Sequence, residues 1–242
     1  PYAAMVKQRG GKVLTFGSGN AELVVDVIQA SAKGLQIQLK FGDLAEALTV
    51  PLLGEFQVQN IGVALGLALA TGGELKPLLK ALTTLQAPPG RMELLPAMVG
   101  DFSVVIDYAH TPDALENALK SLRPLTQNKL HVVFGCGGDR DTTKREPMGK
   151  IAAELADVVV ITDDNPRTED AAQIRQQVGK GAPKAEHIAD RKEAIASAIH
   201  NAAAGDIILV AGKGHEQGQI IGKHKMPFDD RAVVCDILNI QT

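Results

Sequence analysis

Four short apolar runs alternate with amphipathic segments from about residue 91 onward, and this alternation constrains the fold more than any other feature of the chain. The runs are Val104–Ile106, His131–Phe134, Val158–Ile161 and Ile207–Val210. A strand that reads as a continuous apolar run is typical of a parallel sheet covered on both faces. The segments between the runs repeat apolar residues at helical spacing, as in Leu115–Leu122. The pattern therefore predicts an α/β domain with a doubly wound parallel sheet.

The first 90 residues follow a different pattern. Alternating apolar and polar residues predict a half-buried strand over Leu35–Phe41, and two further short strands are predicted over 12–16 and 22–28, with 17–20 as the turn between them. Helices are predicted over Asn60–Ala70 and Leu75–Leu85. Pro88, Pro89 and Gly90 then end helical structure and stiffen the chain. We therefore predict two domains, 1–90 and 91–242.

Charge and composition exclude several classes of function. The net charge is −3 at pH 7 and no run of Lys or Arg occurs, which argues against nucleic-acid binding. No apolar run approaches the roughly 18 residues needed to span a bilayer. Two cysteines, Cys136 and Cys235, favour buried thiols in a reducing compartment, so we expect a cytoplasmic protein. The sequence opens on Pro1 without a secretory signal, and we expect a fragment or a processed chain.

Polar segments follow each of the four apolar runs. They are Asp107–Pro112, Gly135–Asp141, Asp163–Arg167 and Gly212–Glu216. Ligands of an open parallel sheet bind beyond the carboxyl ends of its strands. The sequence therefore predicts that these segments converge on one edge of the sheet and form a binding site there.

Each segment also has a simpler interpretation when it is taken alone. The segment Gly135–Arg140 resembles a dinucleotide fingerprint but has Arg140 where the third glycine belongs, so it fails as one. Residues 139–141 could be a solvated charge run. Asp107 could cap the following helix or accept a hydroxyl such as that of a ribose, and His110 could be purely structural. Arg167 could be an ordinary surface arginine in a turn, and Glu216 could be solvated.

Taken together, the segments suit one kind of ligand. Arg140 and Arg167 can each grip a carboxylate in fork geometry. Asp164 and Glu216 can hold ammonium groups, and Gly212 permits close backbone approach. An amino diacid with two amino-acid ends carries the complementary groups.

The motifs also resemble those of the Mur ligase family, within it the members that add meso-diaminopimelate. They are DYAHTP at 107–112, GGDRDTTKR at 137–145, DNPR at 164–167, GKGHE at 212–216 and PGRME at 89–93. The resemblance covers nearly the whole chain, although Gln57 and Glu146 stand where relatives often carry Asn and Pro. It implies that residues 1–90 are the C-terminal half of an α/β ATPase domain, the central domain of the family. Residues 91–242 would be its Rossmann-like, amino-acid-binding domain.

The resemblance also implies roles for individual residues. The diaminopimelate-binding residues would be Arg140, Asp164, Asn165, Pro166, Arg167, Gly212 and Glu216. Lysine-adding relatives generally lack the arginine at position 167, because lysine has no second carboxylate to pair with it. ATP would be approached by Asn60, Arg91, Asp107 and His110. No metal ligand and no catalytic base are assigned within the chain.

The implied activity is that of an ADP-forming acid–amino-acid ligase with ATP and Mg²⁺. It would add meso-diaminopimelate to UDP-MurNAc-L-Ala-D-Glu through an acyl phosphate, in peptidoglycan precursor synthesis. Three alternatives remain open at this point: a lysine-adding or folylpolyglutamate-type ligase, a non-catalytic ligand-binding module, and, as the weakest, a nicotinamide dehydrogenase.

No phosphate loop of the form G-x-x-x-x-G-K-[ST] occurs in the 242 residues. The resemblance places that loop in the part of the central domain that lies N-terminal to these residues. It also places the UDP-binding domain and a modified lysine that helps to hold Mg²⁺ outside this chain. We therefore expect that the chain as given does not turn over ATP by itself. An assay of phosphate release with all substrates present measures this, and robust ligase turnover would contradict our interpretation of its boundaries.

Overall fold

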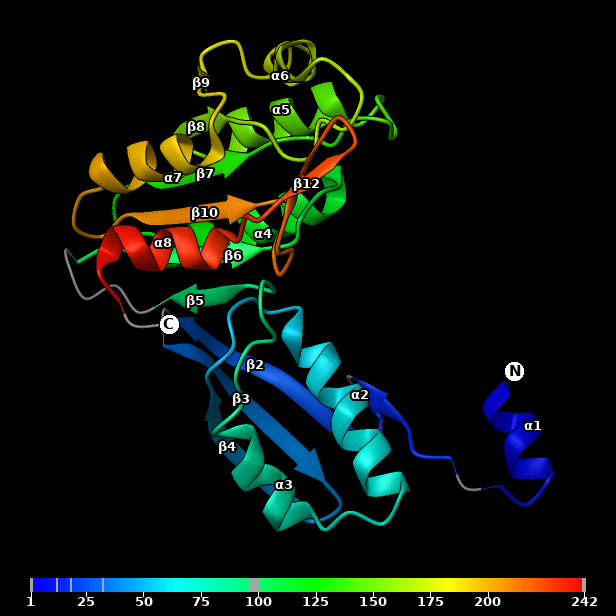
Figure 1. Cartoon of the computed structure of the whole chain (residues 1–242). Helices are drawn as coiled ribbons and strands as arrows, with labels where there is room; N and C mark the ends of the chain where they lie inside the picture. Colours follow the sequence, from blue (N-terminus) through cyan, green and yellow to red (C-terminus); the bar gives the residue numbers. More distant parts are fainter. Residues whose placement is uncertain (1, 12, 18, 32, 96–100, 241–242) are drawn as a thin grey trace. The chain divides into compact units, whose positions relative to one another are not determined.

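The computed structural model describes residues 2–11, 13–17, 19–31, 33–95 and 101–240. The chain divides into two compact units, Pro1–Gln86 and Ala87–Thr242 (Figure 1). The division falls at the start of the proline-rich segment, a few residues before the predicted boundary. Within the described residues, no helix has both the length and the apolar character that a membrane crossing needs.

The first unit is built on a four-stranded sheet in the order β1-β2-β3-β4. Its strands are β1 (Phe16–Gly17), β2 (Leu23–Ser31), β3 (Gly34–Phe41) and β4 (Leu44–Val50). β1 pairs with β2 in parallel, and the other pairs are antiparallel. In β3, alternate residues Leu35, Ile37 and Leu39 are buried, as the predicted half-buried strand requires.

The described residues of the first unit also form the helices α1 (Tyr2–Gln8), α2 (Gln57–Ala70) and α3 (Leu75–Leu82). α2 packs against β2. Some sequence-based bounds were wrong. Of the strand predicted over 12–16, Lys12 lies outside the described residues, residues 13–15 are not in a strand and the strand found is Phe16–Gly17; the second helix ends at Leu82 rather than Leu85. Of the turn predicted over 17–20, Ser18 lies outside the described residues. β4 and α1 were not predicted.

The second unit contains a six-stranded sheet in the order β5-β6-β10-β7-β8-β9. The strands are β5 (Glu93–Leu95), β6 (Ser103–Asp107), β7 (Leu130–Phe134), β8 (Val158–Ile161), β9 (Glu186–His187) and β10 (Ile207–Ala211). All neighbours are parallel except β5, which runs antiparallel to β6. The doubly wound parallel sheet predicted from the four apolar runs is confirmed, with β5 and β9 added at its edges.

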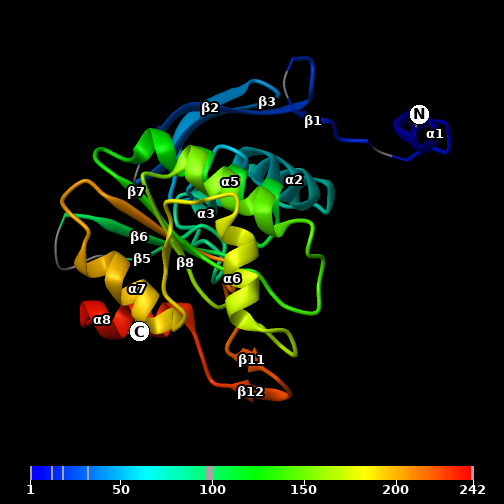
Figure 2. The same cartoon turned by 90° about the horizontal axis from the view of Figure 1, so that it is seen from above.

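Helices cover both faces of this sheet (Figure 1). They are α4 (Pro112–Leu122), continued by the 3₁₀ turn η1 (Arg123–Leu125), then α5 (Arg145–Leu155), α6 (Ala171–Gly179), α7 (Arg191–His200) and α8 (Asp230–Leu238). α4, α5 and α6 pack side by side, whereas α7 and α8 pack together and share a core with alternate residues of the strands, such as Ile106 and Val210. A separate hairpin of β11 (Gln219–Ile221) and β12 (His224–Met226) projects beyond the sheet (Figure 2).

The helix starts follow from their capping residues. The Thr111 hydroxyl accepts a hydrogen bond from the Ala114 N–H at 3.3 Å, and Pro112 takes the first helical position of α4. The side chains of Asp170, Asp190 and Asp229 likewise accept hydrogen bonds from N–H groups in the first turns of α6, α7 and α8. Asp107 is not the cap of α4, which removes the simpler interpretation of that residue.

A buried ion pair joins the ends of three elements at the carboxyl edge of the sheet. Arg191, the first residue of α7, donates through Nε and Nη2 to both carboxylate oxygens of Asp230, the first residue of α8, at 2.7 and 2.8 Å. Its Nη2 also donates to the Ala211 carbonyl at the end of β10 at 2.9 Å. Both side chains are fully buried, so each charge depends on the other for its compensation.

We expect the change Asp230→Ala to lower the free energy of unfolding by about 3–5 kcal/mol, because it leaves the Arg191 charge buried without a partner. Urea denaturation of the whole chain measures the loss. The control is Glu116→Ala, which breaks a solvent-exposed pair with Lys120 on α4 and should cost less than about 1 kcal/mol. Equal losses from the two changes would contradict a structural role for the buried pair.

Candidate functional site

The carboxyl ends of four parallel strands lie at one level, and this level carries the candidate site. The sheet register pairs Ala211 of β10 with Asp107 of β6, and Phe134 of β7 with Ile161 of β8. β10 lies between β6 and β7 in the sheet. The chain enters β7 from α4 and β10 from α7, and these two helices cover opposite faces of the sheet. A crevice forms at such a switch point. The four polar segments are brought to one edge, as the sequence predicted.

A cavity of about 420 Å³ lies at this edge. It is lined by six of the seven residues expected to bind diaminopimelate and by His110; the six are Arg140, Asp164, Asn165, Arg167, Gly212 and Glu216. Pro166, the seventh, does not line it. Arg140 and Arg167, which come from the ends of different strands, therefore share one cavity.

The glycines of the segment after β7 allow two loops to approach each other closely. A Cβ atom added at Gly138 would lie 2.0 Å from the Pro166 carbonyl oxygen, which is far inside contact distance. The Gly138 N–H donates to the Asn165 carbonyl at 2.9 Å. This packing explains a glycine-rich segment that is not a dinucleotide fingerprint, and it gives Pro166 a packing role beside the cavity.

Arg167 is held in an uncommon backbone conformation, with φ at +50°. Its N–H donates to the Ile220 carbonyl at 3.0 Å, and its carbonyl accepts from the Gly222 N–H at 2.6 Å. The hairpin of β11 and β12 therefore holds the Arg167 backbone through an isolated parallel bridge to Ile221. The Arg167 side chain donates through Nη1 to the Gly138 carbonyl at 2.7 Å, which directs the guanidinium across to the neighbouring loop.

Arg140 is less restrained than Arg167. Its side chain is exposed, and its Nη1 donates to the Asp139 carbonyl at 3.0 Å. A guanidinium has five N–H donors, so most of them can still bind a ligand in the cavity. The site thus combines one fixed guanidinium with one that can adjust.

Lys213 is a functional candidate that sequence reasoning missed. Its side chain is 0% exposed, and Nζ donates to Asn165 Oδ1 at 3.2 Å and to Glu216 Oε2 at 3.3 Å. Asn165 Nδ2 donates to the same Glu216 oxygen at 2.9 Å, and Asn165 Oδ1 accepts from the Ile220 N–H. Burial acts to raise the pKa of Glu216, but Asn165 and Lys213 outweigh it and the pKa is lowered, so this carboxylate stays ionised.

Asp164 is the electrostatically costly member of the site. Burial raises the pKa of its carboxyl, although Arg191 and Lys213 oppose the shift. Gly212, with φ at +114°, leaves room for it, since a Cβ atom there would lie 2.7 Å from Asp164 Oδ2. Such a carboxylate gains strongly from a ligand that brings a positive charge.

A second group of residues lies around Tyr108. The Arg91 guanidinium lies over the Tyr108 ring at 4.5 Å, and the rings of His110 and His215 lie 4.6 and 5.5 Å from it. Asp107 accepts from the Met92 N–H at 2.7 Å and from the Ala109 N–H at 2.8 Å, one bond to each oxygen. Three of the four residues expected to approach ATP thus lie in one region.

The fourth of these residues, Asn60, belongs to the first unit. It lies on α2, and its amide donates to Gln57 Oε1 at 2.8 Å one turn earlier. Gln57 itself is buried. The Asn60 side chain is therefore oriented by its own helix.

Seven further residues line the 420 Å³ cavity without having been predicted as site residues: Tyr108, Thr111, Gly135, Cys136, Gly137, Asp141 and Lys144. Lys144 donates through Nζ to the His110 carbonyl at 2.6 Å, which links the loops after β6 and β7. Burial raises the pKa of the Cys136 thiol to about 11, so it stays protonated and is a poor nucleophile. Their positions in the polar segments and quoted motifs after β6 and β7 were the only signal available from the sequence.

Comparison with known proteins gives three kinds of match. A family model described as "Mur ligase, glutamate ligase domain" matches residues 90–214. A protein of Zymomonas mobilis named UDP-N-acetylmuramoyl-L-alanyl-D-glutamate--2,6-diaminopimelate ligase is 50% identical over 234 residues, which are 95% of this chain and 48% of that protein. A protein of the same name from Brucella melitensis is 48% identical over 229 residues, 95% of this chain and 47% of that protein. The chain spans about half the length of the curated relatives it matches.

Solved structures give the third kind of match. A structure of a UDP-N-acetylmuramoyl-L-alanyl-D-glutamate--2,6-diaminopimelate ligase has a TM-score of 0.72 at 37% identity, covering 98% of this chain and 50% of that one. A folylpolyglutamate synthase from Thermotoga maritima has a TM-score of 0.68 at 22% identity, covering 86% of this chain and 47% of that one. The second likeness shows a common fold.

We expect the change Asp164→Asn to raise the free energy of unfolding at neutral pH, because burial raises the pKa of Asp164 and its ionised form therefore destabilises the fold. The gain in the free energy of unfolding should be complete above the raised pKa of Asp164. It should vanish as the pH falls toward 3.8, the ordinary pKa of an aspartate, because the Asp164 carboxyl of the unchanged chain is then protonated and uncharged. Urea denaturation across this range measures it, with the exposed Asp101→Asn as control. A loss of stability at neutral pH would contradict this account of Asp164.

Proposed function

The chain belongs to the Mur ligase family, and we propose that it carries the amino-acid-binding part of a ligase that adds meso-diaminopimelate to UDP-MurNAc-L-Ala-D-Glu. Such a ligase consumes ATP and forms an amide bond in peptidoglycan precursor synthesis. The proposal is supported by relatives named for this reaction and by the charges around the cavity.

One observation carries the proposal: the guanidinium groups of Arg140 and Arg167 line the same 420 Å³ cavity as the carboxylates of Asp164 and Glu216. meso-Diaminopimelate has a carboxylate and an ammonium group at each end. Arg140 and Arg167 match the two carboxylates, and Asp164 and Glu216 match the two ammonium groups. Asn165 is oriented between Lys213 and Glu216, with one N–H of its amide left for the ligand. Gly212 forms part of the cavity wall, and Pro166 packs against Gly138 in the neighbouring loop.

The same arrangement disfavours lysine as the substrate. Lysine carries an ammonium group without a carboxylate at its far end. Beside Arg167, that end would face a like charge and leave the guanidinium without its partner. A lysine-adding or folylpolyglutamate-type role is therefore less well supported than a diaminopimelate-adding one.

We propose that Arg91, Asp107 and His110, all in the second unit, approach ATP. Asn60, in the first unit, remains a candidate for the same role from the resemblance alone. Each oxygen of Asp107 uses one position for a backbone N–H and keeps another for a ribose hydroxyl. Mg²⁺ would accompany the nucleotide. In the described part of the chain no group of three or more His, Cys, Asp or Glu side chains could hold a metal ion, so we assign it no ligand here.

The proposed reaction uses ATP to convert the terminal carboxylate of the dipeptide into an acyl phosphate. One ammonium group of diaminopimelate loses a proton to water, and the neutral amine then attacks the carbonyl carbon of the acyl phosphate. The new C–N bond forms, the C–O bond to phosphate breaks with its electron pair leaving on phosphate, and the nitrogen releases a second proton to the departing phosphate. In this chain, Asp164 and Glu216 would hold the ammonium groups in place, and the two arginines would fix the carboxylates.

We also propose that the protein works in the cytoplasm. Cys136 and Cys235 are both free and buried. Paired cysteines are typical of oxidising compartments, so unpaired buried thiols are consistent with a reducing one.

We expect the change Arg167→Ala to weaken meso-diaminopimelate binding by a factor of about 10 to 100, since hydrogen bonds to charged groups contribute roughly 1.5–3 kcal/mol. Lysine binding should not weaken, because lysine has no second carboxylate. Calorimetric titration of the whole chain measures both ligands.

The control is Arg123→Ala, which removes a guanidinium paired with Asp157 on the surface and should leave both affinities unchanged. If Arg167→Ala binds diaminopimelate as tightly as the unchanged chain does, the assignment of the substrate is wrong.

A further inference from the structure

The two arginines of the cavity belong to separate loops, and the spacing between them is therefore not fixed by either loop alone. Arg140 lies in the loop between β7 and α5, and Arg167 in the loop between β8 and α6. Both carry positive charge, which would drive flexible loops apart. The Arg167–Gly138 and Gly138–Asn165 hydrogen bonds join the two loops at the cavity, and further contacts join them outside it.

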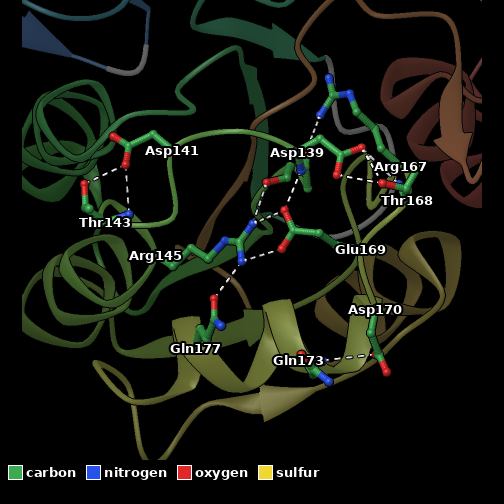
Figure 3. A network of polar contacts seen from close by, with 12 residues as sticks. Asp139, Asp141, Thr143, Arg145, Arg167, Thr168, Glu169, Asp170, Gln173 and Gln177 are labelled. Carbon is green, nitrogen blue, oxygen red and sulfur yellow. Dashed lines mark hydrogen bonds and ion pairs between the residues drawn. The ribbon is translucent and has the colours of Figure 1, made fainter.

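Arg145 and Glu169 make such a contact (Figure 3). Arg145, the first residue of α5, is 1% exposed and donates from Nη1 and Nη2 to the two Glu169 oxygens, each at 2.9 Å. Its Nη1 also donates to Gln177 Oε1 at 2.6 Å, and its Nη2 to the Gly137 carbonyl at 3.2 Å. One guanidinium thus binds the loop after β7, the loop after β8 and α6.

Asp139 and Thr168 make a second contact, reciprocal to the first. The Asp139 N–H donates to Glu169 Oε1. The Asp139 carboxylate accepts from the Thr168 hydroxyl at 2.8 Å and from the Thr168 N–H at 3.1 Å. Asp139 has φ at +52°, a conformation that aspartate tolerates better than most residues. It immediately precedes Arg140, and Thr168 immediately follows Arg167.

These four residues, Asp139, Arg145, Thr168 and Glu169, form what we name the cross-loop network. Thr168 hydrogen bonds lower the pKa of Asp139, and Arg145 lowers the pKa of Glu169, so both carboxylates remain ionised acceptors at neutral pH. Neither Asp139, Arg145, Thr168 nor Glu169 is needed to explain the proposed binding of the amino acid itself.

We propose that the cross-loop network is a specificity-determining device: its members are positioning residues that set the spacing between the Arg140 and Arg167 guanidinium groups, and so select an amino diacid over an amino acid with one carboxylate. This inference rests on the proposed function. A bidentate guanidinium–carboxylate contact needs accurate placement, and a displacement of about 1 Å is enough to cost a large part of its effect.

The test compares two changes at Thr168. Thr168→Val keeps the shape but removes the hydroxyl donor to Asp139, whereas Thr168→Ser keeps the donor. Calorimetric titration of the whole chain with meso-diaminopimelate and with lysine gives the ratio of the two affinities. We expect Thr168→Val to lower diaminopimelate affinity by about tenfold with lysine affinity unchanged, and Thr168→Ser to match the unchanged chain.

Amide hydrogen exchange of the ligand-free chain gives an independent readout. Thr168→Val should speed exchange at the Gly138 N–H and the Asp139 N–H, which lie in the other loop, while Thr168→Ser should not. A thermal melt of each variant shows that it is folded. If Thr168→Val misfolds, Asp139→Asn replaces it, because Asn also tolerates positive φ and it lacks the charge.

The outcomes separate this proposal from the proposed function. If the unchanged chain fails to bind diaminopimelate, the proposed function is wrong and the specificity role falls with it. If the unchanged chain binds diaminopimelate but Thr168→Val keeps the same affinity ratio and the same exchange rates, only the role of the cross-loop network is overturned. Equal defects in Thr168→Val and Thr168→Ser would overturn it too, because the hydroxyl would then be irrelevant.

Discussion

The architecture of this edge depends on the contacts that hold the loop after β7 against the loop after β8, because these two loops carry the guanidinium groups of the cavity. Outside the cavity, Glu169 binds Arg145 and joins one loop to the next. Close packing of Gly138 on the Pro166 carbonyl allows the two loops to meet. The sheet positions both loops, because its parallel register brings the four strand ends to one level.

The fold class and the convergence of the four polar segments could be predicted because they follow from local patterns. Continuous apolar runs mark strands covered on both faces, and Thr111-Pro112 marks a helix start. β5, β9 and the β11–β12 hairpin could not be predicted, since each has only two or three residues and depends on pairing with a distant strand or with Arg167. Short strands carry too little periodicity for a sequence pattern to show.

The site residues divide in the same way. Arg140, Asp164 and Arg167 were candidates because they follow strands, and the structure gathers them at one cavity. Lys213 and Glu169 were missed because their importance lies in contacts across the fold, Lys213 through burial between Asn165 and Glu216, and Glu169 through its pairing with Arg145. Asp164 trades stability for binding. Its buried carboxylate lowers the free energy of unfolding, and the same carboxylate can bind an ammonium group of the ligand.

The most direct test of the central claim is a crystal structure of this chain with meso-diaminopimelate bound. Our account predicts that the two carboxylates of the ligand lie on Arg140 and Arg167, one on each, with the ammonium groups toward Asp164 and Glu216. A ligand bound elsewhere on the chain, or bound in the cavity with Arg167 turned away from both carboxylates, would contradict it.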